Sequence, residues 1–197
     1  MQRNERTFNP ADVRRLEDPE RLSWLPPAAV VSMLDLRPGM CVADIGAGTG
    51  YFSLPLAQAI APGGVVKAVD FEPQMLALLR QKLATPEVAR QIETIHGSAA
   101  ATTLPDSSCD AVLLANVWHE LDEHGAVLAE ARRILREGGR IAILDWRTDV
   151  LRPPGPPLEH RVPMPSVSAA LAAQGWLGAA GQPVGTYNYL VIAGRPR

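Results

Sequence analysis

One stretch near the start of the chain constrains its fold more than any other: Val42-Ala43-Asp44-Ile45-Gly46-Ala47-Gly48-Thr49-Gly50. A short apolar run ends in an acid, and three glycines follow at alternate positions before a helical pattern begins at Tyr51. This order predicts a buried strand, a tight turn that a ligand can approach closely, and a helix N-terminus with unpaired N–H groups. A second apolar run, over 64–69, ends in Asp70, where nucleotide-binding α/β folds place an acid.

Length and charge limit the class of protein. The 197 residues suit one domain that is long enough to bury a substantial core. The formal net charge of −2 supplies no general attraction to phosphate backbones, so we expect no nucleic-acid partner. No apolar run reaches the roughly 20 residues that cross a bilayer, and residues 1–6 lack the apolar segment of a signal peptide. We therefore expect a cytoplasmic protein without a membrane span, and the sequence leaves a homodimer open.

Apolar runs alternate with amphipathic stretches from residue 41 to residue 146. The runs predict strands, and glycines or prolines separate them from the helices between. We expect strands over 41–45, 65–69, 91–96, 110–116 and 140–146, and helices over 50–60, 73–83 and 125–136. Strands that alternate with helices of this length favour parallel βαβ units, so the expected fold class is α/β.

Short helices are expected ahead of this core. Residues 11–16 form a short amphipathic piece, Asp18 is a good N-cap for a second helix, and Pro26-Pro27 begins a third. Such helices either cover the core or form a lid over a ligand, and the sequence leaves both open.

The pattern changes again after Trp146. The proline-rich stretch 152–157 is neither helix nor central strand. A last helix is expected over 166–173, followed by strands over 176–184 and 187–193. Two residues separate these strands, which leaves no room for a crossover helix, so the pair is predicted to be antiparallel. No internal boundary is evident, and we expect one domain over 1–197, with a helical cap at 1–38, an α/β core at 39–148 and a C-terminal part at 149–197.

The glycine turn departs from a dinucleotide site. That fingerprint needs a third glycine three residues after the second, so that the helix packs close to the strand, and Tyr51 stands there instead. Asp44 before the turn would repel a phosphate but attract an ammonium group. A pyrophosphate cradle is therefore disfavoured, and an NAD-dependent oxidoreductase remains only as a rival hypothesis.

These motifs resemble those of the class I S-adenosylmethionine-dependent methyltransferases, over about residues 37–146. The closest branch contains the ubiquinone and menaquinone biosynthesis methyltransferases, which have sequences similar to Asn116-Val117-Trp118-His119-Glu120-Leu121 and Leu135-Arg136-Glu137-Gly138-Gly139. The resemblance implies a Rossmann-like, seven-stranded, mostly parallel sheet with an antiparallel last strand and helices on both faces. It also implies a methyl transfer from S-adenosylmethionine to a small-molecule acceptor, with S-adenosylhomocysteine as product.

The resemblance assigns roles to individual residues. The turn would approach the methionine and ribose parts of the cofactor, Asp44 would lie toward the amino group, and Asp70 would accept from both ribose hydroxyls. Phe71 would pack on the adenine, and the carbonyl of Asn116 would face the amino group. The implied cofactor site comprises Asp44, Gly46, Ala47, Gly48, Gly50, Asp70, Phe71, Ser98, Ala99 and Asn116. If Asp70 is merely structural, it caps the helix that begins near Pro73.

The adenine edge departs from the family pattern. The family usually places an acid after the third strand to accept from the adenine amino group. This chain has Ser98 there, a weaker neutral acceptor, with the N–H of Ala99 available to a ring nitrogen. We expect weaker adenine contacts than usual, and a non-catalytic cofactor-binding module therefore remains as a second rival hypothesis.

The acceptor side is less constrained. A good nucleophile needs only alignment and exclusion of water, whereas a weak one needs a base. His119 and His160 are the candidate bases, although His119 is equally understood as a polar helix entry. Trp118, Trp146 and Arg147 follow strand ends and are expected to line the acceptor pocket.

The residues that are missing argue against three kinds of chemistry. The residues after Asn116 do not form the Asn/Asp-Pro-Pro-aromatic box of methyltransferases that modify base amines. The histidines and cysteines show no ligand spacing, so no metal site is expected. Cys41 and Cys109 lie beside predicted strands and are too few for the three-thiolate site with which some relatives methylate arsenite.

Overall fold

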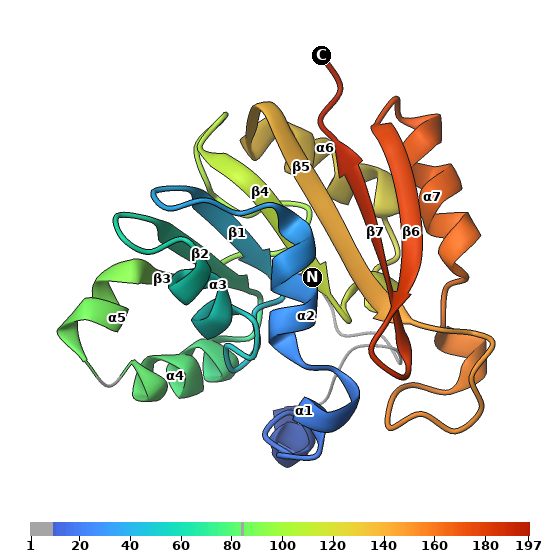
Figure 1. Ribbon diagram of the computed structural model, residues 1–197, viewed down its shortest axis with the longest axis horizontal. Coiled ribbons are helices and arrows are strands. Elements are labelled where there is room, and N and C mark those ends of the chain that lie inside the picture. The colour runs from blue at the N-terminus through green and yellow to red at the C-terminus, as the bar shows by residue number, and fades with distance from the viewer. Residues whose placement is uncertain (1–9, 84) are drawn as a thin grey trace.

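A seven-stranded sheet forms the centre of the computed structural model, which describes residues 10–83 and 85–197 (Figure 1). The strand order is β3-β2-β1-β4-β5-β7-β6. The first five strands pair in parallel, and β7 is antiparallel to both β5 and β6, which confirms the expected mostly parallel sheet. The strands are β1 Cys41–Ile45, β2 Val65–Asp70, β3 Ile92–His96, β4 Cys109–Ala115, β5 Leu135–Trp146, β6 Leu177–Val184 and β7 Asn188–Gly194.

Helices cover both faces of the sheet. The α-helices are α1 Arg21–Trp24, α2 Pro27–Val31, α3 Ser53–Ala59, α4 Pro73–Lys82, α5 Pro86–Gln91, α6 His124–Ile134 and α7 Met164–Ala173. Four 3₁₀ turns are η1 Pro10–Arg15, η2 Ser32–Leu34, η3 Trp118–Glu120 and η4 Leu158–His160. Successive strand residues point to opposite faces, so alternate residues enter two separate cores. Helices α6 and α7 bury one face, and α2, α3 and α4 bury the other.

The expected elements are present, with one additional helix and with differences at the ends of several elements. Helix α5 was not expected, although Thr85 caps it, its Oγ1 accepting from the Val88 N–H at 3.3 Å. The helix expected to reach residue 136 ends at Ile134, and β5 begins at Leu135 rather than residue 140. Asp18 was expected to be the N-cap, but α1 begins only at Arg21, and Glu20 stands at its N-cap position. The Asp18 carboxylate accepts from the Glu20 N–H, just before the helix. Residues 1–9 of the predicted cap lie outside the described residues.

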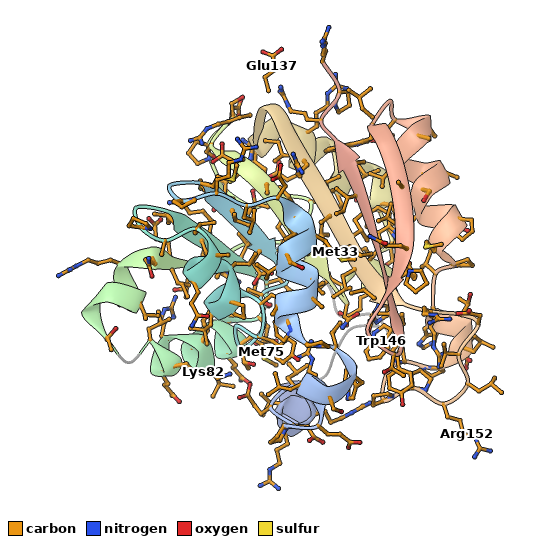
Figure 2. All side chains as sticks on the ribbon, viewed as in Figure 1. Met33, Met75, Lys82, Glu137, Trp146 and Arg152 are labelled. Atoms are coloured by element: carbon orange, nitrogen blue, oxygen red, sulfur yellow. The ribbon has the colours of Figure 1, made fainter. Side chains whose placement is uncertain are left out.

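The carboxyl ends of the parallel strands lie at one edge of the sheet, the lower edge in Figure 1. At this edge α1 and the segment 147–160 flank the strand ends. Figure 2 shows Met75 and Trp146 at the same end, and Glu137 at the opposite end. The Arg15 guanidinium donates to the Pro154 carbonyl at 3.3 Å, and the Thr186 N–H donates to the Trp24 carbonyl at 2.8 Å. The N-terminal and C-terminal parts thus meet over the carboxyl edge.

The described residues, 10–83 and 85–197, contain no helix that is long and apolar enough to cross a membrane. No group of three or more histidine, cysteine and acidic residues in that part of the chain is placed to hold a metal ion. Cys41 and Cys109 are free thiols on the neighbouring strands β1 and β4, with their sulfur atoms 3.9 Å apart.

Candidate active site

A cavity of about 790 Å³ opens at the carboxyl edge of the sheet. It lies where the strand order reverses between β1 and β4, the place at which open α/β sheets hold their ligands. The loops after β1, β2, β4 and β5 supply its base, and residues of the N-terminal part and of 152–157 supply its outer walls. The cavity is thus bounded by segments that are far apart in the sequence.

The glycine turn forms part of the cavity base. The N–H groups of Gly46 and Ala47 both donate to the Val69 carbonyl, at 2.8 and 3.0 Å, which holds the turn against β2. Gly46, Ala47 and Gly48 line the cavity. A Cβ on Gly46 would lie 2.3 Å from Val117 Cγ2, whereas a Cβ on Gly48 would meet, among the described residues, only Leu16 Cδ1, at 3.8 Å. Gly48 is therefore the glycine whose open side faces a ligand.

Gly50 packs against α4. It is not among the residues that line the cavity, and a Cβ there would lie 2.3 Å from Leu79 Cδ1 on α4. Its φ of +87° also lies in the region that side chains avoid. Gly50 thus allows α4 to pack against the turn.

Asp70 joins the end of β2 to the glycine turn. Its Oδ2 accepts from the Gly48 N–H at 2.8 Å, and its Oδ1 accepts from the Glu72 N–H at 2.9 Å. The side chain lines the cavity although the residue is only 6% exposed, and burial raises the pKa of the carboxyl. Each carboxylate oxygen retains a second lone pair, so Asp70 is able to hold the turn and accept from a ligand together.

A buried carboxylate and a buried guanidinium lie on one side of the cavity. Asp44 is 2% exposed and accepts from the Ser53 hydroxyl at 2.6 Å, and its burial raises its pKa to about 6. Arg21 lies over the Tyr51 ring at 3.8 Å, and its burial lowers its pKa to about 10. Both line the cavity, and each favours the charged form of the other. Sequence reasoning missed Arg21 because a short N-terminal helix gives no motif.

The predicted adenine edge is only partly at the cavity. Phe71 lines the main cavity and also an adjoining pocket of about 20 Å³, which Ala99 lines as well. Ser98 lines neither, and its backbone N–H and carbonyl pair with those of Ala101. The structure thus places Ala99 beside Phe71, while Ser98 is part of a tight turn.

His119 lies at the cavity in contact with a carboxylate that the sequence analysis did not single out. Its Nδ1 lies 2.8 Å from Oδ1 of Asp145, and its backbone N–H donates to Oδ2 at 2.8 Å. Asp145 is fully buried at 0% exposed, and its Oδ1 also accepts from the Trp146 N–H at 2.7 Å. Glu120 Oε1 lies 3.8 Å from Nε2. An acid at or next to the end of a strand, like Asp44 and Asp70, was the signal available for Asp145.

Asn116 lies in the loop after β4, at the cavity. Its φ of +57° turns the chain at the strand end, and its N–H donates to the Leu144 carbonyl at 2.8 Å. Its side-chain oxygen accepts from the Asn188 amide at 2.8 Å. Asn188 is buried, and its own Oδ1 has no hydrogen-bond partner among the described residues. The amide pair joins the ends of β4 and β7 beneath the cavity.

Of the residues expected at the acceptor pocket, Trp146 lines the cavity. The ring centroids of Trp146 and Trp24 are 5.5 Å apart, and those of Trp24 and Tyr187 are 5.8 Å apart. All three residues line the cavity. His160 in η4 lines it as well, behind the prolines of 153–157. The aromatic residues and the prolines thus line the same cavity as the glycine turn.

Trp118 and Arg147, the other two residues predicted at the acceptor pocket, lie away from the cavity. Trp118 is 1% exposed and stacks on the ring of His124 at 4.1 Å, because η3 turns it into the core beneath α6. Arg147 pairs with the exposed Asp149 at 2.7 Å. Neither is among the residues that line the cavity.

Comparison with known proteins agrees with this geometry. A family described as "Methyltransferase domain" matches residues 43–143. An uncharacterized methyltransferase of Mycobacterium tuberculosis is 35% identical over 159 residues, which is 75% of this chain and 57% of that protein. A demethylmenaquinone methyltransferase of Listeria monocytogenes is 31% identical over 115 residues, covering 58% of this chain and 48% of that protein. The chain thus spans about half the length of the curated relatives it matches.

A solved structure extends the similarity over almost the whole chain. The S-adenosylmethionine-dependent methyltransferase of Aquifex aeolicus is 28% identical and superposes with a TM-score of 0.89, over 96% of this chain and all of that one. The family match covers the glycine turn, the acid that ends β2, and the chain from within β1 to within β5. The chain therefore belongs to the class I S-adenosylmethionine-dependent methyltransferases, the family whose methyl donor is S-adenosylmethionine.

Proposed function

We propose that this chain transfers the methyl group of S-adenosylmethionine to a small-molecule acceptor held in the cavity of about 790 Å³. One observation carries the proposal: the same cavity has a polar side, built on Gly48 and Asp70, and an aromatic side, built on Trp24, Trp146 and Tyr187. A polar cofactor and an apolar acceptor would then occupy opposite sides of one space.

The polar side suits the chemistry of the methyl donor. Asp70 would accept from the ribose hydroxyls while it holds the Gly48 N–H. Asp44 and Arg21, a buried carboxylate and a buried guanidinium, would face the ammonium and carboxylate groups of the amino-acid part. Phe71 and Ala99 would contact the adenine, and the Asn116 carbonyl would face the amino group. When bound, S-adenosylmethionine supplies an electrophilic methyl group.

The chain's contribution to the rate would be alignment and exclusion of water. The contact between Arg15 and Pro154 joins the N-terminal part to the proline segment beside the cavity. Arg161 donates to the carbonyls of Pro156, Arg147 and Val150, which fixes the course of that segment. These contacts favour the N-terminal helices as a lid. His119 and His160, which both line the cavity, are the proposed bases for an acceptor that needs one.

Calorimetric titration of the chain with S-adenosylhomocysteine tests the cofactor assignment, with NAD as the control ligand. Micromolar binding of S-adenosylhomocysteine, worth about 8 kcal/mol, and no heat with NAD are expected. Binding of NAD alone would replace the proposal by an oxidoreductase. Binding of S-adenosylhomocysteine without turnover of any acceptor would favour a non-catalytic module that keeps the fold and the cofactor.

A further inference from the structure

We propose that Cys41 and Cys109 form an oxidation site, at which a hydroperoxide converts the two thiols into a disulfide bond between β1 and β4. They are the two cysteines of the chain. Each is the first residue of its strand, so the pair lies at the amino edge of the sheet, the upper edge in Figure 1. The site is at the end opposite the cavity and does not depend on the proposed function.

The two side chains meet because an irregularity in β4 places them on the same face of the sheet. Strand residues alternate between faces, and Val112 and Leu114 enter the core beneath α6 and α7. A regular strand would therefore send Cys109 to the other face, with Ala111. The pairing of β4 with β5 shifts between Cys109 and Ala111, and such irregularities re-aim side chains. Cys109 thus enters the core against which Cys41 packs from β1.

The spacing of the two strands suits a disulfide bond. Val42 pairs with Ala111 in the parallel ladder, so Cys41 and Cys109 are offset by one residue. Strands about 4.8 Å apart, with an offset of about 3.3 Å along them, bring the two Cα atoms to about 6 Å. This lies within the range of about 4.4 to about 6.8 Å that disulfide bonds require. The sulfur atoms of the free thiols are 3.9 Å apart, so side-chain rotation has to close a gap of about 2 Å.

A carboxylate holds the backbone of Cys41 beside β4. Asp110 Oδ2 accepts from the Cys41 N–H at 2.7 Å, and the Arg136 guanidinium donates to both oxygens of Asp110, at 2.7 and 2.8 Å. The first residue of β1 is thus tied to the residue that follows Cys109. Arg136 and Lys67 are also close enough to the sulfur atoms to attract a thiolate. Both cations therefore favour ionisation of the pair.

The contact between the sulfur atoms favours the loss of one proton from the pair. The Cys41 thiol donates to Cys109 Sγ, and this hydrogen bond lowers the pKa of the Cys109 thiol, although burial opposes it. The proton that remains lies between two sulfur atoms and is able to pass from one to the other. Cys109 is fully buried, whereas Cys41 is only half-buried and meets an oxidant first. The thiolate is the form that attacks a peroxide.

The oxidation balances with the hydroperoxide as the only co-reactant. The Cys41 thiolate attacks a peroxide oxygen, the O–O bond breaks, and Cys41 becomes a sulfenic acid as hydroxide leaves. That hydroxide takes up the proton that the pair had released. Cys109 sulfur then attacks Cys41 sulfur, the S–O bond breaks, and the leaving oxygen takes the Cys109 proton and departs as water. The two thiols lose two electrons, and hydrogen peroxide is reduced to two water molecules.

Peptide mapping of the unchanged chain tests the bond directly. Reduced protein is treated with hydrogen peroxide, blocked with N-ethylmaleimide in denaturant and digested without reductant. We expect one cross-linked pair of peptides, containing Cys41 and Cys109, from a chain that remains monomeric in denaturant, and dithiothreitol should restore two reactive thiols. Sulfinic or sulfonic acid at Cys41 with Cys109 still free to react overturns the proposal. A bond between two chains, or no oxidation of either thiol, overturns it as well.

Cys109→Ser is the matched variant for the order of the two steps. It keeps the half-buried Cys41 but lacks the sulfur that closes the bond, so the sulfenic acid of Cys41 should persist and react with dimedone. In the unchanged chain, trapping by dimedone should be about 10-fold lower or less, because Cys109 consumes the sulfenic acid first. Equal trapping in both proteins overturns the role of Cys109. The mapping of the unchanged chain decides the proposal if the variant does not fold.

Urea unfolding measures whether the bond fits the folded chain. The bond closes a loop that contains the glycine turn, β2 and β3, and a crosslink over a long loop restricts the unfolded state. Peroxide treatment should therefore lower the equilibrium constant of unfolding by about 100-fold, and dithiothreitol should reverse the change. A bond that raises this constant distorts the sheet and overturns the proposal. None of these measurements requires S-adenosylmethionine or an acceptor, so the proposed function is tested separately.

Discussion

At the scale of single residues, Asp70 holds the glycine turn and is also the proposed acceptor from the ribose hydroxyls. Asp70→Asn keeps the volume but replaces one acceptor oxygen by a donor that faces a backbone N–H, of Gly48 or of Glu72. We expect the affinity for S-adenosylhomocysteine to fall about 100-fold, or about 3 kcal/mol, as for one or two hydrogen bonds to a charged group. Calorimetry measures this loss, and circular dichroism checks the fold.

The control for Asp70→Asn is Asp106→Asn, an exposed carboxylate that pairs with Arg133. Its affinity for S-adenosylhomocysteine should match that of the unchanged chain. If Asp70→Asn also binds normally, then Asp70 serves only to hold the turn, as a cap would.

Residues near a motif were predictable, and residues placed by the three-dimensional fold were not. Asp44 and Asp70 end apolar runs, so the sequence marks them as strand ends on the ligand side. Arg21 reaches the cavity only because the N-terminal part folds across the carboxyl edge. Trp118 was expected at the acceptor pocket because it follows a strand end, but a single 3₁₀ turn directs it into the core and directs its neighbour His119 to the cavity.

At the scale of the element, the glycine turn is a site in which three glycines serve three purposes. Gly46 and Gly50 make room for Val117 and Leu79, whereas Gly48 has an open side at the cavity. Gly48→Ala should therefore fold, with a loss of about 1–2 kcal/mol in the free energy of unfolding because its φ is +54°. It should also bind S-adenosylhomocysteine much more weakly, because the new methyl group occupies ligand space.

Gly138→Ala is the matched control for Gly48→Ala. Gly138 has a φ of +76°, and no atom lies within 4 Å of the position that a new methyl group would take, so the backbone penalty is similar and the cavity is untouched. Urea unfolding should show comparable losses in the two variants, and calorimetry should show weak binding in Gly48→Ala alone. Equal binding by both would mean that the turn does not approach the cofactor.

Contacts between residues far apart in the sequence set the start of β5, and local sequence patterns do not reveal such contacts. The strand β5 begins early because residue 135 pairs with Cys109, and the Arg136 guanidinium binds both oxygens of Asp110 at 2.7 and 2.8 Å. Asp110 also accepts from the Cys41 N–H, so one carboxylate links β1, β4 and the start of β5. Helix α5 was a missed local signal instead, since Thr85 and Pro86 are good residues for a helix start.

At the scale of the whole molecule, the parallel core and the antiparallel last pair of strands followed from the sequence, and the closure of the cavity did not. Right-handed βαβ units and a two-residue hairpin leave few arrangements for seven strands. The contacts that complete the cavity join Arg15 to Pro154 and Trp24 to Thr186, pairs separated by well over a hundred residues. No local pattern encodes such contacts, because they arise only when both cores are packed on the two faces of the sheet.

Asp44 links this site to the stability of the whole molecule through pH. Its folded pKa of about 6 lies above its ordinary value of 3.8, because burial disfavours the charged form and outweighs the Ser53 hydrogen bond and the attraction of Arg21. The unfolded carboxyl thus ionises first as pH rises, and the folded state loses stability between about pH 4 and pH 6. Two pKa units correspond to about 3 kcal/mol when the loss is complete.

Comparison of the unchanged chain with Asp44→Asn isolates this effect, because every other titrating group is common to both proteins. Urea unfolding without ligand should show the stability of Asp44→Asn rising relative to the unchanged chain by about 2 kcal/mol between pH 4.5 and pH 7.5. A difference that stays constant over this range would mean that the buried carboxyl titrates as if exposed. At pH 7.5, saturating S-adenosylhomocysteine should stabilise the unchanged chain more than Asp44→Asn, because the ligand's ammonium group would compensate the buried charge that the variant lacks.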